Sequence, residues 1–249
     1  MRTLALIPAR YDSSRFPGKP LADIDGQLMI ERVYNQTKKA IADVYVATDD
    51  ERIHNAVLNF GGKSIMTSKL HQSGTDRCKE ALLNIESLEG IKYDYVINVQ
   101  GDEPFISPTQ ISLLESTFNG GATELATLIK QSDNINDVLN PNKPKVVINA
   151  KMEALLFSRS PIPFCRGAEP QEWLSKSRYF NHIGMYGYRR DILLQITELP
   201  QSSLELAESL EQLRWLENGY KIACAITNEE SISIDTPEDL EKVLKSINK

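Results

Sequence analysis

The chain has 249 residues, of which 41% are hydrophobic and 25% charged, and its formal net charge is −6. This composition is typical of a globular protein with a self-sustaining core and excludes a disordered chain. The negative charge and the absence of a long basic tract argue against sustained nucleic-acid binding, so any phosphate chemistry requires a local basic site.

The first 150 residues alternate short β-rich runs with amphipathic stretches, which predicts βαβ units around a mostly parallel sheet. The predicted strands span 3–8, 44–48, 63–67, 93–100 and 124–129, and the predicted helices span 28–40, 50–60, 75–88 and 108–118. In an open parallel sheet the loops at the carboxyl ends of the strands gather at one edge, where ligands bind.

The pattern changes near residue 140, where β-rich runs surround a Pro-rich stretch at 160–164. This indicates one domain over 1–249 with an inserted β-rich lobe at approximately 140–200. The remaining predicted strands span 145–150, 154–157, 183–188, 221–226 and 231–234.

Two helices are predicted in the last fifty residues. One covers 203–218 and carries Leu206, Leu210 and Leu213 on one stripe. The other begins at Pro237, with Thr236 as its N-cap.

The three cysteines, Cys78, Cys165 and Cys224, lie far apart without the spacing of a zinc site or a disulfide framework. The apolar start at 4–8 is too short for a signal peptide, and no later run approaches the roughly 18 residues that span a bilayer. We therefore expect a soluble cytoplasmic protein with reduced thiols and no membrane partner.

The loop after the first predicted strand is rich in cations. Residues 7–20 read IPARYDSSRFPGKP and include Arg10, Arg15 and Lys19. Arginine offers a fork of donors to phosphate oxygens, and lysine offers a compact charge for a leaving group, whereas Gly18 is expected to let backbone and ligand approach closely. The alternative is a solvated basic turn. The loop matches neither GxGxxG nor GxxxxGK[ST], so neither a dinucleotide site nor a P-loop is indicated.

Two acids follow other predicted strands. Asp102 ends the apolar run VINVQGD, and Asp235 lies in IDTPEDL before the last helix. Mg²⁺ prefers one or two carboxylates together with phosphate oxygens, so Asp102 is a candidate ligand. Asp235 is either a second ligand or a helix cap.

Residues 71–77, HQSGTDR, form a polar turn into a helix, which suits a nucleotide base or ribose. On its chemistry alone, the turn is better interpreted as a helix cap with Arg77 paired to Asp76 or another nearby acid. Nothing in the sequence separately indicates a catalytic role for His71.

Three further segments, FSR at 157–159, NHIGMYGYR at 181–189 and LEQLR at 210–214, supply the mixture of polar groups that an acidic polyol requires. Such a ligand needs cations for its carboxylate and hydrogen-bonding groups for its hydroxyls. The candidates for the carboxylate are Arg159 and His182, and those for the hydroxyls are Tyr186, Glu211 and Gln212. Alternatively, the tyrosines pack a subdomain face and Glu211 is solvated.

In order and spacing, these motifs resemble the cytidylyltransferases of 3-deoxy-manno-octulosonate (Kdo), also called CMP-Kdo synthetases, from residue 3 to about 243. The resemblance rests on PARYxSxRxPGKPL, HxSGTxR, HIGxYGYR, LEQLR and IDTPEDL. Two departures are visible: Phe16 stands where the family commonly has Leu, and 165–177 follows no recognised motif.

The resemblance implies a Rossmann-like, mostly parallel sheet of the nucleotide-diphospho-sugar transferase type with a smaller β-rich lobe for dimerisation and sugar binding. It implies a magnesium-dependent homodimer that couples CTP to Kdo for lipopolysaccharide core synthesis. The implied nucleotide-binding residues are Pro8, Ala9, Arg10, Arg15, Lys19, Ser73, Gly74, Arg77, Gln100 and Asp102. The implied sugar-binding residues are Gln100, Arg159, His182, Tyr186, Glu211 and Gln212. Arg10, Lys19, Asp102 and Asp235 are the implied catalytic residues, and the last two also hold the metal.

Other interpretations remain open at this point. The acid sugar is alternatively an amino derivative of Kdo or a sialic acid, and a noncatalytic nucleotide-binding regulator would use the same fold. A nicotinamide-dependent oxidoreductase is disfavoured because the glycine fingerprint is absent.

Overall fold

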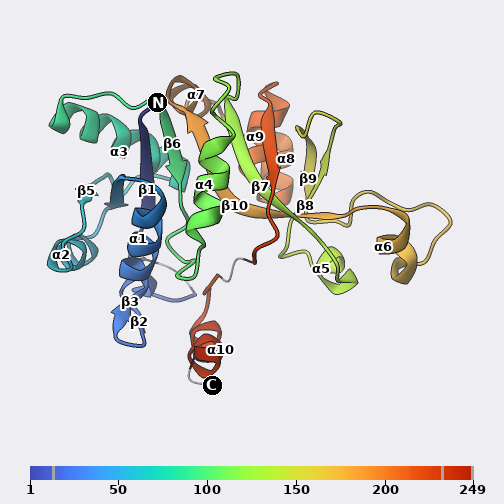
Figure 1. Ribbon diagram of the computed structural model, residues 1–249, viewed down its shortest axis with the longest axis horizontal. Helices are drawn as coiled ribbons and strands as arrows, with labels where there is room; N and C mark the ends of the chain where they lie inside the picture. Colours follow the sequence, from blue (N-terminus) through green and yellow to red (C-terminus); the bar gives the residue numbers. More distant parts are fainter. Residues whose placement is uncertain (13–14, 231–232, 248–249) are drawn as a thin grey trace. The chain divides into compact units, whose positions relative to one another are not determined.

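The computed structural model describes residues 1–12, 15–230 and 233–247 and divides into two compact units (Figure 1). Unit 1 comprises Met1–Ser112 and Ser231–Lys249, and unit 2 comprises Leu113–Glu230. Within the described residues, no helix combines the length and apolar character that a membrane crossing requires.

Unit 1 is built on a parallel sheet with the strand order β6-β1-β4-β5. Its strands are β1 (Thr3–Ala9), β4 (Asp43–Thr48), β5 (Ser64–Met66) and β6 (Tyr95–Asn98), with a small hairpin of β2 (Asp23–Ile24) and β3 (Gln27–Leu28). Its helices are α1 (Met29–Ala40), α2 (Glu51–Asn59), α3 (Gly74–Glu89) and α10 (Pro237–Ile247), and α4 (Pro108–Ser116) spans the division between the units.

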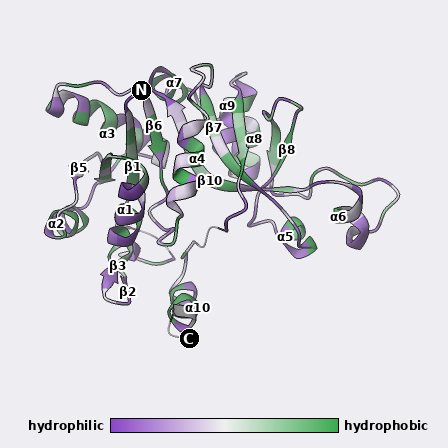
Figure 2. Cartoon of the chain, viewed as in Figure 1, coloured by the Kyte–Doolittle hydropathy of each residue, from purple (hydrophilic) through white to green (hydrophobic). Residues whose placement is uncertain are grey.

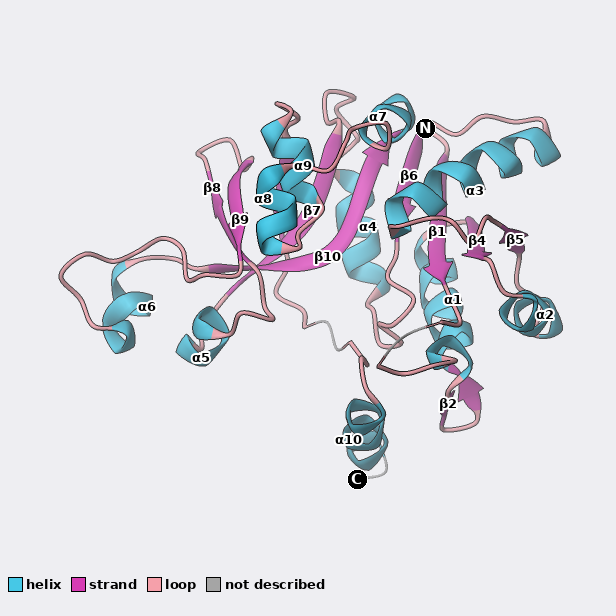
Figure 3. Cartoon of the chain, turned by 180° about the vertical axis from the view of Figure 1, so that it is seen from behind, coloured by secondary structure: helices cyan, strands magenta, loops and turns pink. Residues whose placement is uncertain are grey.

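The strand order creates a ligand-binding edge. The chain runs from β1 through α1 to β4 on one side, then returns through α3 to β6 on the other side of β1. In Figure 1, α1 lies in front of β1. In Figure 3, which views the molecule from the opposite side, α3 lies in front of β1, so the two helices cover opposite faces of the sheet. The strand order therefore reverses between β1 and β6, and ligands of open α/β sheets bind at such a switch point.

Local sequence sets the helix boundaries in unit 1. Asp50 accepts a hydrogen bond from the N–H of Arg52 at the start of α2, and Ser73 accepts one from the N–H of Asp76 at the start of α3. Both are N-caps of the kind that Asp and Ser favour. The predicted cap of α10 is confirmed, since Thr236 Oγ1 accepts from the N–H of Asp239 at 3.3 Å.

The C-terminal helix α10 packs on the rest of unit 1 through one apolar stripe. Figure 2 shows both hydrophobic and hydrophilic residues on this helix. Val243, Leu240 and Leu244 join a cluster with Ile24, Met29 and Ile234. This packing fixes residues 234–236 against the rest of the unit.

Unit 2 contains a mixed sheet in the order β11-β7-β10-β8-β9, in which only β11 and β7 are parallel. The strands are β7 (Leu125–Gln131), β8 (Lys145–Ile148), β9 (Ala154–Ser158), β10 (Phe180–Arg189) and β11 (Ile222–Ile226). The helices are α5 (Ile135–Leu139), α6 (Trp173–Lys176), α7 (Arg190–Ile196), α8 (Ser203–Glu208) and α9 (Gln212–Glu217).

The predicted single helix over 203–218 is wrong. Ser209, with φ +50°, ends α8 in the left-handed region, and α9 starts three residues later. Consequently Leu206 is 62% exposed while Leu210 and Leu213 are buried, so the predicted stripe does not form.

One other predicted strand is not found as expected. Residues 233–234 are not part of a strand, and 231–232 of the predicted strand lie outside the described residues. The stretch 165–177, which follows no recognised motif, folds onto a small core in which Val138, Trp173 and Tyr179 are buried.

Candidate active site

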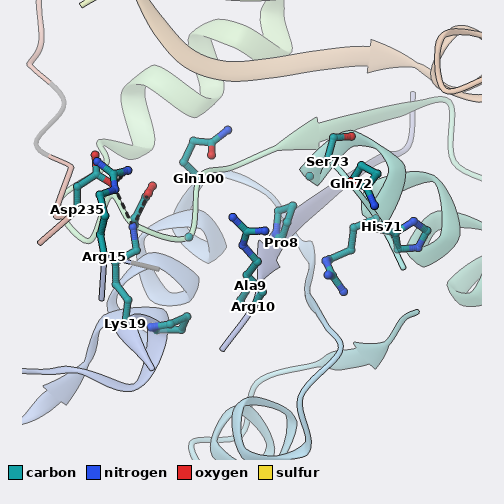
Figure 4. Close-up of a pocket in the computed structure, with 15 residues that line it drawn as sticks. Pro8, Ala9, Arg10, Arg15, Lys19, His71, Gln72, Ser73, Gln100 and Asp235 are labelled. Atoms are coloured by element: carbon teal, nitrogen blue, oxygen red, sulfur yellow. Dashed lines mark hydrogen bonds and ion pairs between the residues drawn. The ribbon is translucent and has the colours of Figure 1, made fainter. Parts of the chain in front are cut away.

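A polar cavity of about 290 Å³ opens at the switch point of unit 1 (Figure 4). It is lined by the end of β1, the loop that follows, the turn before α3 and the first turn of that helix, the loop after β6 and the segment before α10. The lining residues are Pro8, Ala9, Arg10, Arg15, Lys19, Pro20, His71, Gln72, Ser73, Gly74, Arg77, Gln100, Gly101, Asp102 and Asp235. All ten residues predicted to bind the nucleotide are among them.

One end of the cavity holds a cluster of charges. Lys19 Nζ donates to Asp102 Oδ2 at 2.8 Å and to Asp235 Oδ1 at 3.3 Å, and Arg15 Nη2 donates to the same Asp235 oxygen at 3.1 Å. Lys19 is the most enclosed of the four ion-paired residues, with 14% of its side chain exposed. Two carboxylates and two cations from three distant segments therefore meet at one place.

The backbone brings the two acids together. The N–H of Ile234 donates to the carbonyl oxygen of Asp102 at 2.9 Å, so the residue before Asp235 is tied to Asp102 itself. Because Thr236 caps α10, the carboxylate of Asp235 is not needed as its cap. Of the two roles that the sequence left open for Asp235, the helix cap is therefore filled by Thr236.

Lys19 is placed by the turn that precedes it. Gly18 has φ +73°, its N–H donates to the carbonyl oxygen of Tyr11 at 2.9 Å, and it begins the 3₁₀ turn Lys19–Leu21. A Cβ atom at Gly18 would lie 3.0 Å from the Tyr11 ring. Glycine is therefore favoured here by the backbone conformation and by the Tyr11 ring.

Arg10 differs from the other cations of the cavity. Its side chain is exposed, and it forms no hydrogen bond or ion pair with any residue of the described part of the chain. Figure 4 shows it between the charge cluster around Lys19 and the turn that carries Ser73. An unpaired guanidinium in a cavity is available to an anionic ligand.

The other end of the cavity is formed by the turn before α3. Arg77 is buried and donates to Asp49 Oδ2 at 2.8 Å and to Thr67 Oγ1 at 2.6 Å, so its partner is a nearby acid other than Asp76. His71 contacts Glu80 through Nε2. Arg77 consequently lines the cavity with its charge already compensated.

Sequence reasoning missed several residues of the cavity and its supports. Pro20, Gln72 and Gly101 line it, and a Cβ atom at Gly101 would lie 2.8 Å from the carbonyl oxygen of Pro8. Asp49 follows β4 at the same edge, so the strand-end rule that identified Asp102 would also have found it.

Gln100 lies in the cavity of unit 1, whereas the other five residues predicted to bind the sugar lie in unit 2. Within unit 2, the rings of His182 and Tyr186 have centroids 5.3 Å apart, and Tyr186 packs edge-on against Trp215 of α9 at 5.1 Å. This packing links β10 to the helix that begins with Gln212. Arg159 immediately follows β9.

The environment of His182 makes it a neutral group. Its Nε2 lies 3.0 Å from Thr127 Oγ1, and burial lowers the pKa of His182 to about 3. It therefore offers a ligand hydrogen bonds from a neutral imidazole, not the positive charge that the sequence suggested.

Unsatisfied polar atoms mark the same region. Tyr186 Oη, Gln212 Nε2 and Asn181 Oδ1 are buried and have no hydrogen-bond partner among the residues that the structure describes. Burial also raises the pKa of Tyr186, so its hydroxyl keeps its proton. Buried polar groups are almost always hydrogen-bonded in native proteins, so these three atoms are available to a polar ligand.

The fold and the cavity together define a nucleotidyltransferase. A cytidylyltransferase structure from Leptospira borgpetersenii, 16% identical, shares the fold with a TM-score of 0.62 over 100% of this chain and 87% of its own. A family model described as cytidylyltransferase matches residues 4–222.

Closer relatives specify the branch of the family. The 3-deoxy-manno-octulosonate cytidylyltransferase of Parabacteroides distasonis is 56% identical, covering 98% of this chain and 97% of its own. That of Bacteroides thetaiotaomicron is also 56% identical, over 96% of each chain. A structure of CMP:2-keto-3-deoxy-manno-octonic acid synthetase complexed with CTP is 42% identical, with a TM-score of 0.90 over 100% of this chain and 99% of that one. The chain therefore belongs to the cytidylyltransferase family, in its 3-deoxy-manno-octulosonate branch, which confirms the predicted resemblance and fold class.

Proposed function

We propose that the protein transfers CMP from CTP to the anomeric 2-hydroxyl of Kdo, giving CMP-Kdo for lipopolysaccharide core synthesis and releasing pyrophosphate. The observation that carries this function is the contact of Lys19 with both Asp102 and Asp235 in the cavity of unit 1. In this reaction the sugar oxygen bonds to the α-phosphorus while the bond between the α-phosphorus and its bridging oxygen breaks. The sugar hydroxyl loses its proton, and pyrophosphate leaves with the bridging oxygen.

The residues of the cavity bind and neutralise the nucleotide. Arg10 has no ion-pair partner among the described residues, and Arg15 and Lys19 can exchange a carboxylate partner for phosphate oxygens when CTP enters. Lys19 then stabilises the charge that develops on pyrophosphate. Phosphoryl transfer of this kind depends on positioning and charge neutralisation, so no covalent nucleophile is needed.

The two carboxylates fit a magnesium ion. Asp102 and Asp235 are oxygen donors that already share one cation, and the other groups around them suit a triphosphate. Mg²⁺ is bound in proteins by one or two carboxylates together with substrate phosphates, so this donor set matches its preference. When bound there, Mg²⁺ would neutralise charge on the triphosphate.

Unit 2 supplies the sugar-binding groups. Arg159 would bind the carboxylate of Kdo, while neutral His182, Tyr186, Glu211 and Gln212 would bind its hydroxyls. The orphaned atoms Tyr186 Oη and Gln212 Nε2 support this assignment, since hydroxyl groups would satisfy both.

A homodimer also belongs to the proposal. Among the described strands, β9 pairs with β8 alone, although Glu153, the residue before it, forms one isolated bridge to Ala223 of β11. In this outer strand Leu155 is 61% and Leu156 37% exposed. An edge strand with exposed apolar side chains is a surface that proteins usually cover, and a second copy would do so.

A cytoplasmic location stays a prediction. The three cysteines carry free thiols.

Pyrophosphate release tests the function. Purified protein with CTP and Mg²⁺ would be offered Kdo, 8-amino-Kdo and N-acetylneuraminate in parallel. Turnover with Kdo supports the proposal, and turnover with another sugar alone would replace the substrate but keep the chemistry. No release with any of the sugars would favour a noncatalytic nucleotide-binding regulator.

A further inference from the structure

Hydrogen bonds to other groups of unit 2 hold both the main chain and the side chain of Arg159. Its main-chain N–H donates to Glu208 Oε2 at 2.8 Å, and its carbonyl oxygen accepts from Lys145 Nζ at 2.6 Å. Its guanidinium donates from Nε to the carbonyl oxygen of Glu208 at 2.6 Å, from Nη1 to that of Pro141 at 3.0 Å, and from Nη2 to that of Ser209 at 3.3 Å. Both the main chain and the side chain are thereby fixed in one arrangement.

These contacts leave two N–H donors of the Arg159 guanidinium available to a ligand. An arginine side chain has five N–H donors, and three of those of Arg159 are used in the described part of the chain. The remaining two lie one on each terminal nitrogen. Two donors on neighbouring nitrogens are the arrangement that binds both oxygens of a carboxylate.

Lys145 holds Arg159 from inside the sheet. It is fully buried at the start of β8, in register with Ser158 on one side and Asn181 on the other. Its ammonium donates to the carbonyl oxygens of Asn140 and Arg159 and contacts no carboxylate among the described residues. Burial lowers the pKa of Lys145, while the charge of Glu208 opposes this shift. A buried ammonium is costly, so its placement against the carbonyl oxygen of Arg159, the residue that follows β9, calls for a function beyond packing.

Glu208 holds Arg159 from the end of α8. Its Oε1 accepts from Ser158 Oγ at 2.6 Å, and its Oε2 accepts from the N–H of Arg159. One carboxylate therefore ties the last residue of β9 and the residue after it to α8.

We propose that Lys145 and Glu208 are positioning residues that present the two remaining N–H groups of Arg159 to the carboxylate of the acid sugar. The inference rests on the proposed function, because it takes Arg159 as a sugar-binding residue. Neither Lys145 nor Glu208 touches the substrate.

Steady-state kinetics of Glu208→Ala provide the first test, with Glu217→Ala as the matched control. Glu217 also accepts one serine hydroxyl, from Ser203 at 2.9 Å, and one backbone N–H, from Leu204 at 3.1 Å, but it does not touch Arg159. We expect Glu208→Ala to raise the KM for Kdo about tenfold while kcat and the Kd of CTP change less than twofold. Glu217→Ala should leave all three values within twofold. An equal effect of the two variants on the KM for Kdo would overturn the inference.

A double variant separates positioning from a general structural effect. If Glu208 acts through Arg159, Glu208→Ala adds less than twofold to the KM of Arg159→Met, whereas independent effects would multiply. Multiplying effects would contradict the proposal.

A measurement without substrate distinguishes failure of this inference from failure of the proposed function. The Nε–H of Arg159, observed by NMR in the sugar-free protein, should exchange with solvent at least tenfold faster in both Glu208→Ala and Lys145→Met. Unchanged exchange in both variants overturns the positioning role even if Kdo is the substrate. Faster exchange in an enzyme that rejects Kdo keeps the positioning role and refutes the substrate.

Discussion

Lys19 and Asp102 are 83 positions apart in the chain, and the Nζ atom of Lys19 donates to Asp102 Oδ2 at 2.8 Å. The same ammonium reaches Asp235, which is 216 positions from Lys19. One cation therefore joins the loop after β1, the loop after β6 and the segment before α10. The proposed nucleotidyl transfer therefore depends strongly on the Nζ atom of Lys19.

Replacing Lys19 by methionine should reduce kcat by a factor of about 10²–10³, because a charge aimed at the developing anion is lost. The matched control is Lys63→Met, since Lys63 Nζ also approaches two carboxylates, Glu89 at 3.4 Å and Asp43 at 3.9 Å, but does not line the cavity. Pyrophosphate release by both variants checks this. Retention of more than a tenth of the activity by folded Lys19→Met would contradict the assigned role.

Turnover should stop when EDTA removes divalent metal and return when Mg²⁺ is added in excess. In Asp102→Asn and in Asp235→Asn, we expect at least tenfold more Mg²⁺ to be needed for half-maximal rate, because each variant loses a charged oxygen donor. A magnesium titration of initial rates measures this. If both variants respond to Mg²⁺ as the unmodified enzyme does, these residues do not hold the metal.

The neutral His182 predicts a pH dependence of stability. Its pKa is lowered to about 3 in the folded protein, so between pH 6.5 and 3 only the unfolded chain binds the proton. Its contribution to the free energy of unfolding is therefore complete above pH 6.5 and falls as the pH falls toward 3. From pH 7.5 to 5.5 the unmodified protein should lose about 1 kcal/mol more than His182→Gln does. Urea denaturation of both proteins at the two pH values gives this difference, and parallel losses would show that His182 is not buried as described.

Arg214 and Glu205 form a buried ion pair that joins α9 to α8. Arg214 Nε donates to Glu205 Oε2 at 2.7 Å and Nη2 to Oε1 at 2.5 Å, so the contact is bidentate. We expect Arg214→Met to lower the free energy of unfolding by about 3–5 kcal/mol, because it leaves a buried carboxylate unpaired. Adding Glu205→Leu to that variant should recover part of the loss, as chemical denaturation would measure. A double variant less stable than Arg214→Met would contradict this explanation.

Gly18→Ala should weaken CTP binding severalfold, since φ +73° disfavours a side chain and the new Cβ would press on the Tyr11 ring beside Lys19. Gly90→Ala is the control: Gly90 has φ +68° but its Cβ would meet nothing within 4 Å. Calorimetric titration with CTP compares the two variants. Equal CTP affinities would show that the Gly18 turn does not place the cavity's cations.

Much of the fold follows from local patterns. Strands such as β4 and β11 are short runs of β-favouring residues, and the caps at Ser73 and Thr236 have side chains that satisfy helix N–H groups. The break between α8 and α9 was not predictable in this way. The leucine spacing continues through it, and the break depends on the left-handed Ser209 together with the tertiary contacts of Arg159 and Arg214.

The candidate site was predictable to the extent that it follows from strand ends. Arg10 and Asp102 follow β1 and β6, and the parallel sheet places both at one edge. The ion-pair partner of Arg77 was not predictable, because the sequence does not distinguish Asp49, which follows β4, from Asp76, which precedes Arg77. Burial of His182 likewise depends on contacts from β7 and β9 that no local pattern reveals.

The most direct test of the account is the fate of ¹⁸O placed in the anomeric 2-hydroxyl of Kdo, followed by ³¹P NMR during turnover with CTP and Mg²⁺. Attack of that hydroxyl on the α-phosphorus predicts the label in the bridging oxygen of CMP-Kdo and none in pyrophosphate. Unlabelled CMP appearing as free nucleotide, with all of the label still in unreacted Kdo, would contradict transfer to the sugar.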